Sequence, residues 1–249
     1  MRIDSVSTGG RGPIRSVVQF RVLGVVTAEI HGTSVELGDI AQRRALTGLL
    51  AALGQFVSRD ELMDWVWDIP PADAHTALDA LIETVRADRL APIGLGDALV
   101  CGGGIHKLAV PPEWVDLHRF RTLTERAAQL DDVDAREFLA AALHSVRGIP
   151  LADLPGRRVA EFRREVAEEI RAAEITFGRI EVERGRGSRM LPRLEQLFRD
   201  FPGDAAIAEV YLAALHSSGL SPAMVAARTR SARRARENWA DAARTASAR

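Results

Sequence analysis

The residues of this chain whose types and spacing suit a chemical task lie between positions 76 and 107. Arginine and lysine side chains neutralise phosphates, and carboxylates accept a hydrogen bond from cytosine N4. The spacing of residues 76–89 places several of them on the exposed face of one helix. The candidate DNA contacts are Thr76, Asp79, Ala80, Glu83, Arg86, Arg89, His106 and Lys107.

Each of these residues also has a plainer interpretation. Arg86 fits an ordinary surface charge equally well, and Arg89 fits that interpretation better. Asp79 and Glu83 are typical of a solvated helix face. A second group of arginines, between positions 228 and 236, is interpreted as part of a solvated terminal helix rather than as a nucleic-acid site.

Signatures of catalysis and of metal binding are absent from the sequence. The six histidines are scattered without metal-ligand spacing, and the single cysteine, Cys101, cannot form an internal disulfide. The glycine run 102–104 precedes a predicted strand, so it indicates a turn rather than a phosphate cradle. We therefore expect no cofactor, no metal and no enzymatic activity. The lone cysteine and the lack of a long apolar run predict a cytoplasmic protein without a membrane partner.

Length and composition predict two folded domains. Hydrophobic residues make up 47% of the chain and the net charge is −1, so a large core can form without a global bias toward polyanions. Proline residues at 111 and 112 mark the expected boundary. We expect a flexible leader over 1–16, a winged-helix domain over 17–112, a helical domain over 113–232 and a frayed tail over 233–249.

The first half has the pattern of a small sheet followed by three helices and a hairpin. Ser58 and Glu61 form an S-x-x-E capping box, and the apolar residues of the third helix follow the 3.6-residue period. Strands are predicted over 17–26, 28–30 and 34–37, helices over 39–53, from 58 to the prolines at 70 and 71, and over 73–90, and a hairpin over 98–101 and 105–110. This order is that of a winged helix-turn-helix, in which the third helix enters the major groove and the hairpin is the wing.

The second half has helical periodicity throughout. Its longest stretch, 159–184, spaces apolar residues by threes and fours, and shorter helices follow it up to the glycine at 219. Helix pairs joined by short turns predict a tetratricopeptide-like helical repeat domain. The fold class is therefore mainly α, with a winged helix-turn-helix at the N-terminal end. Residues from 228 onward lack a clear apolar stripe, so we expect this end to fray.

Short segments in a fixed order carry a resemblance to a known family. They are residues 20–24 (FRVLG), 42–46 (QRRAL), 57–62 (VSRDEL), 70–72 (PPA), 106–108 (HKL), 115–120 (VDLHRF) and 147–154 (RGIPLADL), together with Trp67. On these segments the chain resembles the Streptomyces antibiotic regulatory protein family. That resemblance implies an OmpR-type winged-helix domain and a bacterial transcriptional activator domain. It also implies promoter binding to double-stranded DNA as a homodimer, contact with RNA polymerase or another regulator, and activation of secondary-metabolite gene clusters.

The third helix departs from the family pattern. Asp79 stands where the family usually has glutamine, and Glu83 stands where it usually has serine. Between residues 15 and 112 there are eight basic and twelve acidic residues, a net charge of −4. Acidic groups on a groove-facing helix repel a duplex. A second hypothesis is therefore a divergent member that has weakened or lost DNA binding and acts as a protein–protein interaction module.

Overall fold

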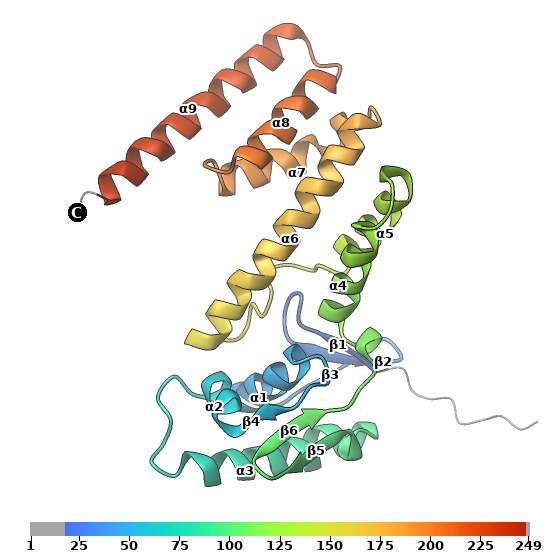
Figure 1. Cartoon of the computed structure of the whole chain (residues 1–249), viewed down its shortest axis with the longest axis vertical. Coiled ribbons are helices and arrows are strands. Elements are labelled where there is room, and N and C mark those ends of the chain that lie inside the picture. The colour runs from blue at the N-terminus through green and yellow to red at the C-terminus, as the bar shows by residue number, and fades with distance from the viewer. Residues whose placement is uncertain (1–17, 248–249) are drawn as a thin grey trace, which may run out of the picture. The chain divides into compact units, whose positions relative to one another are not determined.

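The structure is a computed structural model that describes the backbone of residues 18–247 and the side chains of residues 18–239. The chain forms two compact units (Figure 1). Unit 1 contains the described residues up to His118 together with Leu151–Val159, and unit 2 contains Arg119–Pro150 and the residues from Ala160 onward. The leader predicted over 1–16 lies outside the described residues.

The N-terminal sheet of unit 1 is a three-stranded antiparallel meander, in the order β1 (Val18–Arg21), β2 (Thr27–Ile30) and β3 (Thr33–Val35). His31 and Gly32 join β2 to β3 with φ angles of 51° and 81°, as a two-residue hairpin of type I′ requires. β1 is shorter than the predicted strand 17–26. It ends at Arg21 because the next two backbone N–H groups donate to the carboxylate of Asp116 instead of to a strand.

Three helices follow the sheet. α1 (Ile40–Ala51) and α2 (Arg59–Val66) both start with a capping box, and the predicted pair Ser58 and Glu61 forms the second one. The two helices pack closely at Gly48, where an added Cβ would lie 2.8 Å from the ring of Trp65. Ile40, the first residue of α1, does not face the core and is 46% exposed. The reason is its position in the first turn of α1, directly after the cap.

The third helix and the hairpin complete the winged-helix order. α3 (Ala74–Thr84) continues as one π-helical segment, Val85–Leu90, so the helical stretch ends where the sequence predicted. The hairpin consists of β5 (Leu99–Gly102) and β6 (Ile105–Leu108), and β4 (Val57–Ser58) pairs with the other edge of β6. Gly103 and Gly104 form the turn with positive φ, while Gly102 pairs with Ile105 and belongs to the strand.

Two later segments of the chain also pack into unit 1. Asp116, which is 1% exposed, accepts hydrogen bonds from the N–H groups of Val22, Leu23 and Leu117 at 2.8–3.1 Å. A ring nitrogen of His118 lies 2.5 Å from the carbonyl oxygen of Leu50. These contacts extend unit 1 beyond the prolines at 111 and 112. The domain division at 112/113 stays a prediction.

A second segment, around residue 153, also packs into unit 1. Asp153 accepts a hydrogen bond from the N–H of Val26 at 2.9 Å and pairs with Arg43. Arg44 donates to the carbonyl oxygens of Val66 at 2.8 Å and Pro155 at 2.6 Å. Side chains of α1 therefore hold both the end of α2 and a segment more than a hundred residues away.

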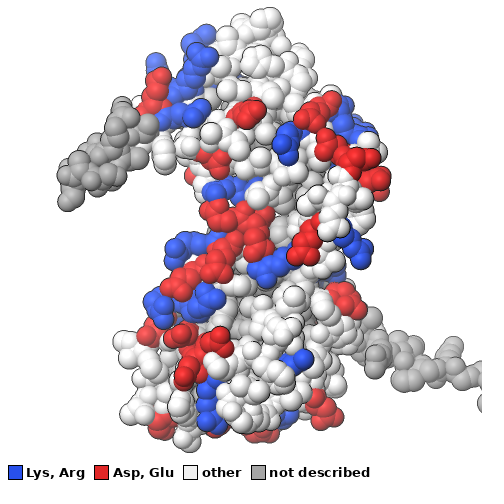
Figure 2. Space-filling view, viewed as in Figure 1, with Lys and Arg blue, Asp and Glu red and all other residues white. Residues whose placement is uncertain are grey.

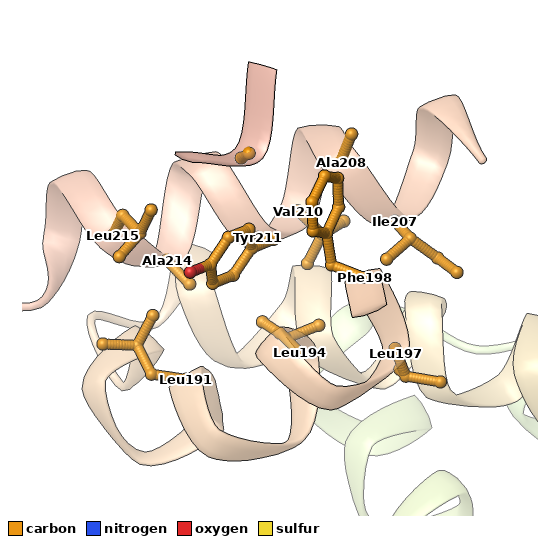
Figure 3. Close-up of a cluster of buried hydrophobic side chains, with 11 residues drawn as sticks. Leu191, Leu194, Leu197, Phe198, Ile207, Ala208, Val210, Tyr211, Ala214 and Leu215 are labelled. Atoms are coloured by element: carbon orange, nitrogen blue, oxygen red, sulfur yellow. The ribbon is translucent and has the colours of Figure 1, made fainter. Parts of the chain in front are cut away.

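Unit 2 is all-helical, and one of its buried clusters lies between its last helices. Its residues form most of α4 and α6 and all of the other helices. The helices are α4 (Asp116–Ala127), α5 (Asp132–His144), α6 (Arg157–Glu183), α7 (Gly187–Asp200), α8 (Ala205–Ser217) and α9 (Pro222–Ser247). Figure 3 shows apolar side chains of α7 and α8 pointing toward one another. The rings of Phe198 and Tyr211 are stacked, with their centroids 5.4 Å apart. At Gly187 an added Cβ would lie 3.2 Å from the Cα of Ala214, so the two helices approach closely. Paired helices joined by short turns match the predicted helical repeats.

The last helix includes most of the tail predicted to fray from residue 233, and fraying itself stays a prediction. α9 continues through Ser247, and Val225, Ala232 and Ala235 pack against the α7–α8 core. Alanine and arginine are strong helix formers, and the three small apolar residues supply enough contact to dock the helix. Within residues 18–247, no helix is long and apolar enough to cross a bilayer.

Candidate nucleic-acid interface

The exposed face of α3 contains four of the predicted contacts. Thr76, Asp79, Ala80 and Glu83 are exposed, while Leu78 and Ile82 on the opposite face are buried. These positions recur every three or four residues, which is why the helical period separated them correctly. The structure thus presents one polar helix face in the position that a winged helix uses to read the major groove.

Asp79 is bound to an arginine that the sequence did not single out. Arg59, the first residue of α2, donates from Nε and Nη2 to the two carboxylate oxygens of Asp79 at 3.1 and 2.6 Å. Both side chains are partly exposed. Twenty positions separate them in the chain, and no local pattern links an N-terminal residue of one helix to the middle of the next. The pair neutralises the acid at the centre of the candidate interface.

Arg86 uses all three guanidinium nitrogens within unit 1. Nε donates to Oε2 of Glu83, Nη1 to the carbonyl oxygen of Gly96, and Nη2 to Sγ of Cys101, each at 3.2 Å. Burial raises the pKa of the Cys101 thiol, and the charge of Arg86 opposes that shift. Cys101 is exposed and free, as expected of a strand residue without a disulfide partner. Arg86 therefore ties α3 to the wing.

Arg89 and Lys107 are half-buried, and both contact unit 1 residues. Nε of Arg89 donates to Oε1 of Gln42 at 3.1 Å, so this arginine is held against the start of α1. Nζ of Lys107 lies 5.3 Å from the ring centroid of Phe56, a cation–π contact. Lys107 sits on the wing with its ammonium near the surface, whereas Arg89 is directed toward α1.

His106 does not belong with the surface residues. It is 4% exposed, and neither ring nitrogen has a hydrogen-bond partner among the residues that the structure describes. Burial lowers its pKa, which the charge of Asp79 opposes and the charges of Arg59 and Arg86 reinforce. Because side chains alternate across a strand, His106 faces inward with Leu108, and a duplex on the outer surface does not reach it. We therefore remove His106 from the candidate contacts.

On the remaining candidate surface, the two arginines are already paired with acidic side chains. Arg59 and Arg86 each lie beside an acid of α3, and the basic groups nearby are fewer than the acids. Exposed ion pairs of this kind contribute about 0–1 kcal/mol, so a phosphate can displace them at little cost. In the part of the chain that the structure describes, no group of three or more His, Cys, Asp or Glu is placed to bind a metal ion.

Comparisons with known proteins agree with this architecture. The family described as bacterial transcriptional activator domain matches residues 115–237. The chain is 28% identical over 194 residues to transcriptional regulatory protein MoaR1 of Mycobacterium tuberculosis, covering 74% of this chain and 62% of that protein. It is 32% identical over 219 residues to regulatory protein DnrI of Streptomyces peucetius, covering 81% of this chain and 79% of DnrI. This chain belongs to the Streptomyces antibiotic regulatory protein family.

A solved structure of another regulator shares the fold of this family member. Mycobacterium tuberculosis EmbR, solved in complex with a low-affinity phosphopeptide, matches with a TM-score of 0.78 at 26% identity. The match covers 91% of this chain and 60% of the EmbR chain. The chain thus spans about three fifths of the length of MoaR1 and about half of the length of the EmbR protein. The predicted winged helix followed by helical repeats is confirmed.

Proposed function

We propose that this family member regulates transcription by binding double-stranded DNA through α3 and the β5–β6 wing. The observation that supports this function best is the exposed face of α3, with Thr76, Asp79, Ala80 and Glu83, in a chain of this family. The protein acts in the cytoplasm as an activator of secondary-metabolite genes, and it is not an enzyme. Its relatives MoaR1 and DnrI are named regulators.

The proposed contacts divide into two kinds. Residues of α3 that face outward read base edges, and Asp79 or Glu83 accepts from cytosine N4 when its arginine turns away. Arg59 and Arg86, once released from those acids, contact phosphates beside the groove, and Lys107 does the same from the wing. The exposed Arg59–Asp79 pair makes this exchange inexpensive.

The helical unit supplies the partners in this proposal. Unit 2 forms the homodimer and touches RNA polymerase or another regulator, as membership of the family implies. The phosphopeptide belongs to the EmbR structure, and this chain covers only 60% of that chain. We therefore assign no phosphopeptide site to unit 2.

The proposal is tested with one added carboxylate on the α3 face. Ala80→Glu is expected to weaken binding at least about tenfold to sequences selected from a random duplex library, because a further anion would face the groove. The matched control is Ala141→Glu, at an exposed alanine of α5. Fluorescence anisotropy measures both. Equal affinity of the two variants would remove α3 from the interface.

One observation favours a second function, an interaction module without DNA binding. Both acids on the α3 face are already bonded to arginines, Asp79 to Arg59 and Glu83 to Arg86. If that pairing is permanent, the library selection enriches no sequence, and Ala80→Glu leaves regulation in the cell intact. Enrichment of a motif by the parent chain excludes this alternative.

A further inference from the structure

The arginine-rich part of α9 forms a cationic surface among the described side chains of unit 2. Five arginines lie between positions 228 and 236, and Glu237 is the one acid between residues 222 and 239. Figure 2 shows basic side chains gathered along this helix with an acidic group among them. Within the described residues, Arg228 alone of the five has a carboxylate in ion-pair range, Glu195 at 3.9 Å.

The docking of α9 leaves these arginines at the surface. Ala232 is 5% exposed and faces the α7–α8 core, with Ala235 beside it. Further along, the ring of Trp239 lies on Gly203, where an added Cβ would meet it at 2.5 Å. The helix is therefore held on one side at two places, and Arg230, Arg233 and Arg234 are exposed to solvent.

The spacing of the arginines destabilises the helix by charge repulsion unless an anion is bound. Arg230 precedes Arg233 by three positions and Arg234 by four, and Arg233 precedes Arg236 by three. Like charges at these spacings repel each other on a helix surface. Glu237, four positions after Arg233, offsets only part of that repulsion. Elsewhere in unit 2 the structure pairs arginines with acids, as in Arg121–Glu169 and Arg136–Glu181.

A hollow next to the arginines has the chemistry of a nucleotide site. Arg233, Arg236 and Trp239 succeed each other every three residues and, with Gly203 and Glu237, line a hollow of about 340 Å³. The Trp239 side chain is 49% exposed there. Guanidinium groups bind phosphates with paired hydrogen bonds, and an exposed indole stacks on a base or sugar. An acidic protein surface would use the arginines but not the indole.

We propose that α9 binds the phosphodiester backbone of nucleic acid, through Arg230, Arg233, Arg234 and Arg236, without reading sequence. This contact goes beyond the one proposed for α3, because it supplies salt-dependent affinity rather than base recognition. It replaces the interpretation of this segment as a merely solvated helix. Double-stranded DNA, with about one charge per 1.7 Å of helix axis, offers the arginines the denser array of phosphates. Stacking of the Trp239 indole on a base would be added only with a single strand.

The test uses the full chain and a random-sequence duplex, with the salt raised from about 50 to about 200 mM. The four substitutions Arg230→Gln, Arg233→Gln, Arg234→Gln and Arg236→Gln are combined. The logarithm of affinity falls with the logarithm of salt by about 0.9 for each neutralised phosphate, so the variant's slope should be shallower by up to about 3.6. Glutamine keeps the helix propensity, and circular dichroism checks the helical content.

The matched control removes the same charge from exposed arginines outside α9, by Arg126→Gln, Arg179→Gln, Arg189→Gln and Arg199→Gln. This control should keep the parent's slope. A steeper salt dependence with a labelled single strand than with the duplex would assign the surface to single strands and still support the proposal. Equal slopes for the two quadruple variants would overturn it, as would binding of the parent to polyglutamate but not to DNA.

The two proposals fail differently. If α3 does not read DNA, the library selection enriches no motif, yet the α9 variant still loses its salt-dependent affinity. If α9 does not bind phosphates, a motif is enriched and the slope is unchanged.

Discussion

α3 with its π-helical extension and α9 differ in how the charges on their surfaces are matched. Arg86 and Arg89 extend from the end of α3 and are bonded to unit 1 groups, while Asp79 at its centre binds Arg59. On α9, four of five arginines in the described region lack a carboxylate partner. The difference teaches that the position of a helix in the fold and the charge on its surface can serve separate functions. We propose base reading for the winged helix and further, salt-dependent attraction for phosphates on α9.

The largest expected effect comes from removing the buried carboxylate of Asp116 in unit 1. Asp116→Ala leaves the buried N–H groups of Val22, Leu23 and Leu117 without their acceptor, and each unsatisfied donor costs about 1–3 kcal/mol. Unit 1 should lose at least about 3 kcal/mol of unfolding free energy. Amide hydrogen exchange at Val22 and Leu23 measures it. The control Asp132→Ala, at an exposed position of α5, should change little, and unaltered protection in Asp116→Ala would contradict the role of this carboxylate.

A smaller effect, on DNA affinity, should come from removing the acidic partner of an arginine at α3, so that its charges resemble those of α9. Asp79→Asn removes the acid that binds Arg59 and frees the guanidinium for phosphate. Binding to a random duplex should tighten, and the salt slope should steepen by about 0.9 because Arg59 then neutralises one more phosphate. Asp88→Asn removes the same charge from an exposed position of the π-helical segment without releasing Arg59. If the two variants bind alike, the pairing of Arg59 is irrelevant to affinity.

The smallest expected effect is a pH dependence set by the same charged groups. Burial holds the pKa of His106 below its ordinary value, with Arg59 and Arg86 adding to that shift and Asp79 opposing it. The unfolded chain therefore takes up a proton that the folded chain resists, so stability is lost as pH falls through about 6.5. The loss is about 1.4 kcal/mol for each pH unit between the two pKa values.

The His106 prediction is checked by urea unfolding of parent and His106→Leu at about pH 7.5 and about pH 5.5. The variant should show a smaller difference between the two conditions, because leucine binds no proton. An unchanged difference would mean that other groups cause the acid sensitivity.

Short-range sequence patterns predicted most of the helices and strands that position the candidate interface. The capping box at Ser58 and Glu61, the turn at Gly103 and Gly104, and the buried period of α3 all depend on residues within one turn of each other. The alternation in β6 also held the signal that His106 faces inward with Leu108, a signal our sequence prediction did not use.

What the sequence did not predict depends on distant partners. The bonds of Arg59 to Asp79 and of Asp116 to Val22 join residues that no periodicity connects. Docking of α9 likewise depends on the packing of Val225, Ala232 and Ala235 against α7 and α8, since small residues do not form a visible apolar stripe. Sequence reasoning therefore located the candidate face of α3 but could not show which of its charges are already satisfied.

The bonds from Asp116, His118 and Asp153 into the first unit have a consequence for how such regulators diversify. A winged helix cut from this chain at the proline pair would leave behind groups that complete its own interior. Recombination that exchanges only the N-terminal part between paralogues is therefore expected to destabilise the first unit, unless both distant segments are exchanged with it. The first unit is therefore expected to be inherited together with the segments around residues 116 and 153 as a single heritable block.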